Sequence, residues 1–99
     1  MVRVIMTWDI QDNKEKDYIE FAVTELSPGL HALGLTISDV WYTLTGSGPE
    51  MIIFGMMENR ADALGLLRSR DWRRLAERLN EYVENVRVKV VEPKGPFQL

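Results

Sequence analysis

The sequence comprises 99 residues, of which 45% are hydrophobic and 27% are charged, and its formal net charge is -3. This length corresponds to one domain with one core, and the composition is that of a folded chain rather than a disordered one. Because the chain has no cysteine, it has no disulfide, no thiolate zinc site and no cysteine nucleophile, a pattern typical of a reducing compartment.

Neither a membrane span nor a secretion signal is recognisable in the sequence. The apolar run MIIFGMM at 51–57 is far shorter than the roughly 20 residues that cross a bilayer. The N-terminal stretch MVRVIMTWD reaches Asp9 after a short apolar run and lacks a small-residue cleavage site. We therefore expect a cytoplasmic protein with no membrane partner.

The hydrophobic period predicts first a strand and then a helix. Residues 2–9 alternate between apolar and mixed positions, with the period of two that is typical of a strand. Asp12 and Glu15 have the spacing of a capping box, and apolar residues then recur at helical spacing to about Leu26. The Ser-Pro-Gly sequence at 27–29 is expected to end this helix, because proline lacks the amide hydrogen.

A hairpin is predicted in the middle of the chain. Residues 35–45 are rich in β-branched and aromatic types, and GSGP at 46–49 separates them from the second strand-like run, EMIIFGMME at 50–58. The Gly-Ser-Gly sequence is not interpreted as a phosphate cradle, because a cradle needs a following helix and a strand follows here.

Two helices are predicted after the hairpin. Asn59 is a good cap for a short helix over 60–68, and Ser69 is expected to cap a longer helix from Arg70 to about Glu84.

The stretch RSRDWRRL at 68–75 is interpreted as one side of an ordinary helix. At about 100° per residue, Trp72 falls on the apolar stripe, whereas the arginines fall outside it and face water. Glu77 and Glu81 lie three or four residues from arginines, a spacing at which opposite charges meet. Over 68–85 five arginines face four acidic residues, leaving 5 - 4 = +1. Nucleic-acid binding needs unbalanced positive charge, so no nucleic-acid partner is expected.

The chain is expected to end with a strand and a tail. VRVKVVE at 86–92 alternates as a strand, which sets the domain at 1–92, and prolines and a glycine break the pattern in a tail over 93–99. Phe97 and Leu99 are expected either to contact a partner subunit or to belong to a mobile terminus.

The element order predicts a ferredoxin-like α+β fold, βαββαβ, with a four-stranded antiparallel sheet and the helices on one face. The third predicted strand is apolar on both sides, so the second face of the sheet needs a cover. In a chain this short we expect a second copy to provide it, in a homodimer that meets face to face or edge to edge. The face that meets the helices contains either Ile53 or Phe54, and the pattern leaves both open.

This pattern over about residues 2–92, with ENRADALGLLRSRDWRRLAERLNEYVENVRVKVVEP leading through the last helix and strand, resembles the dimeric α/β-barrel superfamily. That group includes antibiotic biosynthesis monooxygenase-like, stress-responsive and NIPSNAP-type domains. The resemblance implies a homodimer whose sheets form a barrel, with a ligand cavity between sheet and helices in each subunit. Members range from cofactor-free monooxygenases through haem-degrading enzymes to proteins of no known activity, so the fold fixes no function.

Candidate site residues are few. His31 is the only histidine, and it is expected either to stabilise a helix end or to line the cavity. The same choice between ligand pocket and core or dimer interface applies to four aromatic residues, which are Trp8, Tyr42, Phe54 and Trp72.

No cofactor is expected. Haem-degrading members of the superfamily use a histidine on the second helix, and this sequence has none between Asn59 and Glu92. One histidine without cysteine would leave carboxylates to complete a metal site, so no metal is expected. Asp9 and Glu58, at the ends of neighbouring predicted strands, form either a carboxylate pair or a charged rim.

Two functions of different class follow. The first is a homodimeric barrel protein that binds a small, largely apolar molecule or serves as an interaction module. The second is a cofactor-independent monooxygenase or isomerase acting on an aromatic or polyketide-like substrate, with Tyr42 and His31 orienting it and transferring protons.

Overall fold

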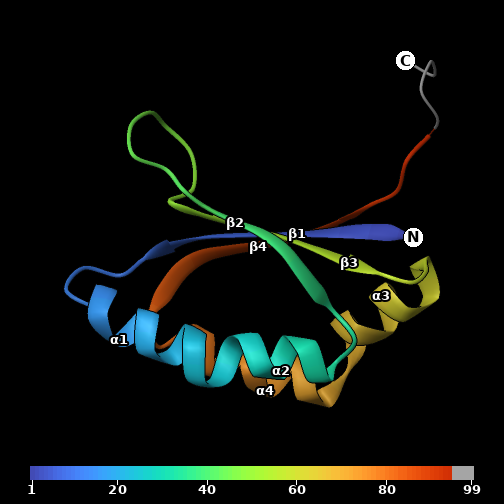
Figure 1. The fold of residues 1–99 in the computed structure, drawn as a ribbon. Coiled ribbons are helices and arrows are strands. Elements are labelled where there is room, and N and C mark those ends of the chain that lie inside the picture. The colour runs from blue at the N-terminus through green and yellow to red at the C-terminus, as the bar shows by residue number, and fades with distance from the viewer. Residues whose placement is uncertain (95–99) are drawn as a thin grey trace.

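Four strands form one antiparallel sheet, and all the helices cover the same face of it in a computed structural model that describes residues 1–94 (Figure 1). The strand order is β2-β3-β1-β4, so β2 and β4 are the edges. The predicted ferredoxin-like α+β fold is confirmed. The elements are β1 (Val2–Ile10), α1 (Glu15–Phe21), the π-helix η1 (Ala22–Leu26), α2 (Ser27–Ala32), β2 (Thr36–Tyr42), β3 (Met51–Met57), α3 (Arg60–Arg68), α4 (Arg70–Leu79) and β4 (Val83–Val91).

The core lies between the sheet and the helices. Every second residue of β1, from Val2 to Ile10, points toward the helices and is buried, as the alternation predicted. Burying such side chains stabilises the fold by about 1.5–3 kcal/mol each. Trp8 and Met6 of the sheet and Leu30 and Leu79 of the helices are at most 1% exposed. This layer is therefore filled by the protein's own side chains.

The first helix does not end at Pro28, and that prediction is wrong. The helical run continues from Glu15 to Ala32 and passes through the five-residue π-helix η1. The Ser27 amide donates to the carbonyl of Ala22, five residues back, and Pro28, which has no amide hydrogen, stands in the first turn of α2. A proline at a helix start keeps the chain helical, and the wider turn accommodates its ring.

The predicted capping box also does not form. The residue before the helix is Lys14, whose side chain makes no capping bond, and its amide donates to the Gln11 carbonyl at 3.0 Å. Asn13 has φ 65°, a left-handed conformation that asparagine tolerates. This tight turn places Asp12 outside the helix, which begins at Glu15.

The caps of the second helical pair are confirmed. The Asn59 side chain accepts from the amide of Asp62 at 2.9 Å, and the Ser69 hydroxyl accepts from the amide of Trp72 at 3.0 Å. The longer helix ends at Leu79, five residues earlier than predicted.

The last strand begins earlier than predicted, at Val83, because this residue pairs with Ile10 in the ladder between β4 and β1. The Gln11 amide also donates to the carbonyl of Tyr82, at 2.9 Å. Strand pairing therefore replaces the last helical turn. Phe97 and Leu99 lie outside the described residues, so the prediction for them stands as it was.

The predicted hairpin of β2 and β3 is confirmed, and its loop rises from the sheet on the side away from the helices (Figure 1). Gly46 and Gly48 have φ 109°, which favours glycine. The Thr43 amide donates to the Glu50 carbonyl at 2.8 Å, and this bond closes the base of the loop. Within residues 1–94, no helix is both long and apolar enough to cross a membrane.

Candidate functional site

Two of the predicted ligand-binding aromatics, Trp8 and Trp72, belong to the core. Trp8 is 0% exposed and its Nε1 donates to the Tyr18 hydroxyl at 3.0 Å, with the two rings edge to face. Burial raises the pKa of Tyr18, since the phenolate would lose its hydration there. Trp72 on α4 is 8% exposed. Both side chains therefore fill the helix-sheet layer.

His31 is exposed on α2 and lines a groove between the helical run and the edge strand β2. The groove has a volume of about 400 Å³, within the roughly 300–1,000 Å³ range of small-molecule sites. Its lining is mainly aliphatic, with a few polar groups beside the imidazole. The residues that line it with His31 are Val23, Ser27, Pro28, Leu35, Thr36 and Ile37.

The π-helix is next to this groove. Val23 belongs to η1, and Ser27 and Pro28 follow it directly. π-helical turns occur often at functional sites. Sequence reasoning missed this part of the groove because Pro28 was interpreted as a helix end; a proline within an otherwise continuous helical pattern was the available signal.

Tyr42 and Phe54 do not share the His31 groove. Tyr42 is at the far end of β2 from Thr36, which lines the groove. Six residues of strand at about 3.3 Å each separate them by roughly 20 Å. Phe54 is on the other face of the sheet from Trp8, because it pairs with Ile5. The five predicted ligand-binding residues are thus distributed over the groove, the core, a strand end and the open face.

The face of the sheet opposite the helices, called the open face below, carries apolar side chains that no part of residues 1–94 covers. Ile52, Phe54 and Met56 of β3 point to this side, together with Ile5 of β1, and all four are partly buried. Trp41 on the edge strand β2 is 60% exposed. Such a patch on a sheet is typical of an interaction surface.

Asp9 and Glu58 do not form a pair, and this alternative is wrong because β1 and β3 are antiparallel. Asp9 follows Trp8, which pairs with Met51, whereas Glu58 is at the opposite end of β3. The Glu50 residue that contacts Asp9, at the base of the hairpin loop, does so through its backbone amide.

The Asp9 carboxylate instead connects three segments. Its oxygens accept from Asn85 Nδ2 at 2.9 Å and from the Glu50 amide at 3.0 Å, and Glu50 Oε1 accepts from the Ile10 amide at 3.0 Å. The bonds from Asn85 and Glu50 lower the pKa of Asp9. This cluster attaches the hairpin loop to β1 and β4.

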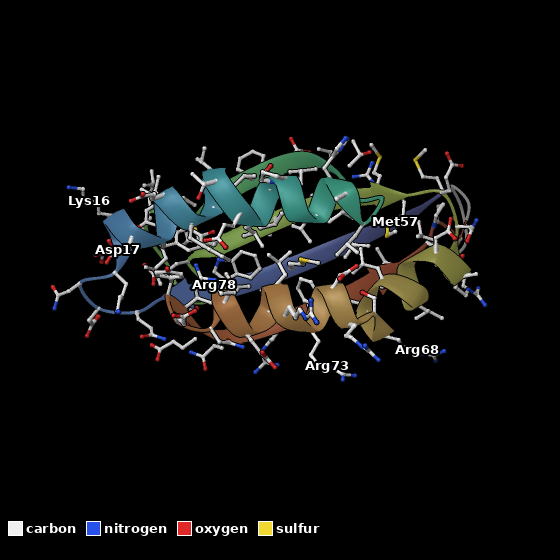
Figure 2. All side chains as sticks on the ribbon, turned by 90° about the horizontal axis from the view of Figure 1, so that it is seen from below. Lys16, Asp17, Met57, Arg68, Arg73 and Arg78 are labelled. Carbon is white, nitrogen blue, oxygen red and sulfur yellow. The ribbon has the colours of Figure 1, made fainter. Side chains whose placement is uncertain are left out.

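The arginine-rich helix faces water on the outer surface, as predicted. Figure 2 shows Arg78 between the two helical runs, while Arg73 projects outward from α4, on the side away from the other run. Arg78 pairs with Glu25 at 2.6 Å and Glu81 at 2.7 Å, and it lies over the Phe21 ring. These carboxylates raise the pKa of Arg78. Arg78 therefore joins the two helical runs, and its contacts are internal to the protein.

Within residues 1–94, no group of three or more histidine, aspartate and glutamate side chains is arranged to hold a metal ion.

The sheet order and the one-sided helices define a ferredoxin-like α+β fold. Comparison with solved structures confirms this fold. The chain is similar to a NIPSNAP domain protein from Burkholderia xenovorans, with TM-score 0.71 and 14% identity over 100% of this chain and 99% of that one. No protein-family model matches the sequence, and no curated protein matches it.

Two further structures show the same fold. One is a protein from Arabidopsis thaliana, with TM-score 0.75 and 13% identity over 99% of this chain and 100% of that one. The other is an antibiotic biosynthesis monooxygenase-like protein from Nitrosomonas europaea, with TM-score 0.66 and 11% identity over 96% of this chain and 100% of that one. The predicted resemblance thus holds at the level of fold, and fold by itself assigns no activity.

Proposed function

We propose that this protein is a homodimer that binds a small, largely apolar molecule in each subunit. The observation that carries the proposal is the second apolar face of the sheet. Ile5, Ile52, Phe54 and Met56 form a continuous surface that the helices do not cover. A second copy that places the same face against it buries both surfaces at once, in the commonest kind of symmetric contact.

The ligand site in this proposal is the His31 groove at the edge of the helix-sheet layer. The interior of that layer is filled, and the groove has a suitable volume of about 400 Å³. The aliphatic part of its lining suits an apolar molecule, and the imidazole offers a hydrogen-bonding group beside it. His31 thus takes the cavity-lining role among the two expected for it.

Native mass spectrometry on freshly purified protein tests both parts together. We expect a dimer with a reproducible additional mass, which should decrease in His31→Ala and persist in Lys16→Ala, an exposed change on α1 outside the groove. A monomeric wild type would contradict the dimer. An additional mass that is equally abundant in His31→Ala would exclude this groove as its site.

The dimer part has a separate test in Phe54→Glu. A charge on the open face opposes burial against a second copy, and the monomer tolerates it because Phe54 is outside the helix-sheet layer. We expect a folded monomer by light scattering and circular dichroism. Ala61→Glu adds the same charge on the exposed surface of α3 and should remain dimeric.

A second candidate is a cofactor-independent monooxygenase or isomerase acting on an aromatic or polyketide-like substrate. The observation in its favour is the likeness to an antibiotic biosynthesis monooxygenase-like protein, together with a histidine in a groove. His31 would be the proton-transfer group, since Tyr42 is roughly 20 Å along the strand. Oxygen consumption with quinols and other aromatic compounds, lost in a folded, dimeric His31→Ala variant, would support it.

A further inference from the structure

Two pairs of exposed apolar side chains continue the walls of the His31 groove beyond the residues that line it. Ile19 and Val23 of the first helical run are 59% and 69% exposed, and Val40 and Tyr42 of the edge strand β2 are 56% and 54% exposed. Within residues 1–94, none of the four packs in the core. The fold therefore does not require an apolar residue at these positions, and apolar side chains gathered in one region mark an interaction site.

The helix wall follows the side of the run that is turned toward β2. Val23, Ser27 and His31 line the groove at intervals of four residues, and Ile19 precedes Val23 by the same interval. On a regular α-helix this spacing drifts by about 40° per step, or roughly 120° from Ile19 to His31. A π-turn holds more residues than an α-turn, so η1 takes back part of this drift. The π-helix thus keeps Ile19 and His31 closer to one face.

The strand wall depends on a second irregularity. Val40 pairs with the buried Ile53, so it points to the helix side of the sheet, and Tyr42 two residues later points the same way. The pairing shifts register between Ile37 and Asp39, which adds one residue to β2. Because of this bulge, Ile37 of the groove also points to the helix side. The extended groove is defined below by both walls, Ile19 to His31 and Ile37 to Tyr42.

The two walls have similar lengths. Ile19 and His31 are twelve residues apart on the helical run, which is about 18 Å at 1.5 Å per residue. Ile37 and Tyr42 are five residues apart on the strand, which is about 17 Å. One acyl chain spans half of the roughly 30 Å hydrocarbon core of a bilayer, about 15 Å. The walls therefore match a long unbranched chain, whereas a compact ring system would contact only the His31 end.

The polar end of the extended groove is at His31. An imidazole donates a hydrogen bond in either of its charge states, and bonds to an ionised acceptor are the stronger ones. No residue that lines the groove in the described part of the chain is acidic. The site thus favours a carboxylate beside His31 and a hydrocarbon chain that leads away from it.

We propose that the His31 groove binds an unbranched long-chain carboxylate, with the head group at His31 and the chain along the extended groove. This inference rests on the ligand site proposed above and specifies the class of ligand. Val40 and Tyr42 point to the helix side of β2, opposite to the open face. A partner subunit on the open face therefore does not compete for these side chains.

A series of carboxylates of increasing length tests the proposal. Isothermal titration calorimetry with hexanoate, octanoate, decanoate and dodecanoate, each below its micelle concentration, measures the dissociation constants. Each added methylene should tighten binding by up to about fourfold as it meets apolar surface. Cyclohexanecarboxylate, which is compact, should bind no more tightly than hexanoate.

Variants locate the two ends of the ligand. Ile19→Ser changes the end far from His31, so we expect it to weaken dodecanoate binding about fivefold and to leave hexanoate within about twofold. His31→Ala removes the head-group contact and should weaken both at least about tenfold. Leu64→Ser is the matched control, because Leu64 is 38% exposed on α3 and lies outside the groove. It should leave both dissociation constants unchanged, and circular dichroism checks that each variant is folded.

The outcomes separate this inference from the ligand site on which it rests. Dodecanoate that binds no more tightly than hexanoate, or equally well to Ile19→Ser, would overturn the long-chain ligand. The groove would survive that result if His31→Ala still weakened binding. An absence of dodecanoate binding would also overturn the long-chain ligand, and the additional mass in His31→Ala would then decide on the groove by itself.

Discussion

Both faces of the sheet carry apolar side chains, but they differ in what covers those side chains. On β1, Met6 points to the helices and is 1% exposed, while its neighbour Ile5 points to the open face and borders a depression there. The helix face is completed by the chain itself, and the open face is left uncovered by residues 1–94. The first face therefore carries the stability of the subunit, and the second is free to carry association.

The largest effect is expected from a charge placed on the helix face of β3, and the same charge at the next residue, on the open face, separates subunit stability from association. Ile53 is 5% exposed and packs in the core, so Ile53→Glu buries an unpaired carboxylate. The cost, on the order of 3–5 kcal/mol or more, is comparable to the whole stability of many domains. We expect loss of the folded state by circular dichroism.

Phe54→Glu is the matched control, because it places the same charge one residue later and on the other face. It should keep the fold and lose only the dimer. If both variants unfold, the open face contributes to the subunit's own stability and the division between the faces is wrong. If Ile53→Glu remains folded and dimeric, the core assignment of β3 is wrong.

The sequence could predict that β3 is apolar on both sides, but not which side meets the helices. That choice depends on the register between strands, and a pattern of period two is unchanged when its faces are exchanged. The element order and two helix caps were predictable because they depend on local signals, such as Asn59 and Ser69. The π-helix before Pro28 was not, because the sequence signal there was a proline, which either ends a helix or occupies the first turn of one. The early start of β4 at Val83 was not, because strand pairing overrides local preference there.

The candidate site was less predictable than the fold. The aromatic residues left a choice between ligand pocket and core or dimer interface, and the structure places Trp8 and Trp72 in the core and Phe54 on the open face. The groove was marked in the sequence only by His31 and by a proline within a helical pattern. Grooves between a helix and a strand are formed by residues distant in sequence, so their lining depends on packing that periodicity does not encode.

A smaller loss of stability is expected in the core between sheet and helices, where the buried Trp8 side chain donates a hydrogen bond to the buried Tyr18 hydroxyl. In Tyr18→Phe the indole Nε1 loses its acceptor without loss of ring volume. An unsatisfied buried donor costs about 1–3 kcal/mol of folding stability. Urea denaturation measures this loss when Tyr18→Phe is combined with Phe54→Glu, because the expected monomer unfolds without a dissociation step.

Tyr82→Phe is the comparison for this change. The Tyr82 ring stacks on Phe21 with centroids 5.0 Å apart, and the stack does not depend on the hydroxyl. We expect Tyr82→Phe, made in the Phe54→Glu variant, to have nearly the same free energy of unfolding as Phe54→Glu alone. Equal losses for Tyr18→Phe and Tyr82→Phe would show that the Trp8 bond adds nothing specific.

The smallest expected effect concerns the attachment of the hairpin loop, which rises beside the open face. The bonds from Asn85 and the Glu50 amide lower the pKa of Asp9 in the folded protein. A carboxyl group whose pKa is lowered on folding stabilises the fold at pH values above its pKa in the unfolded chain, which is about 3.9. This stabilisation is lost as the pH falls through the pKa of the folded protein. Acid should therefore loosen the loop before it disrupts the core.

Asn85→Gly isolates this contribution. Asn85 has φ 58°, which glycine adopts without strain, so the change removes the amide donor and keeps the backbone. We expect the pKa of Asp9 to rise toward its ordinary value. Carbon-detected NMR of the Asp9 carboxyl group measures this pKa. The free energy of unfolding should then depend less steeply on pH below about pH 4. An unchanged Asp9 titration would show that the Glu50 amide holds the carboxylate without Asn85, and that β4 has no part in attaching the loop.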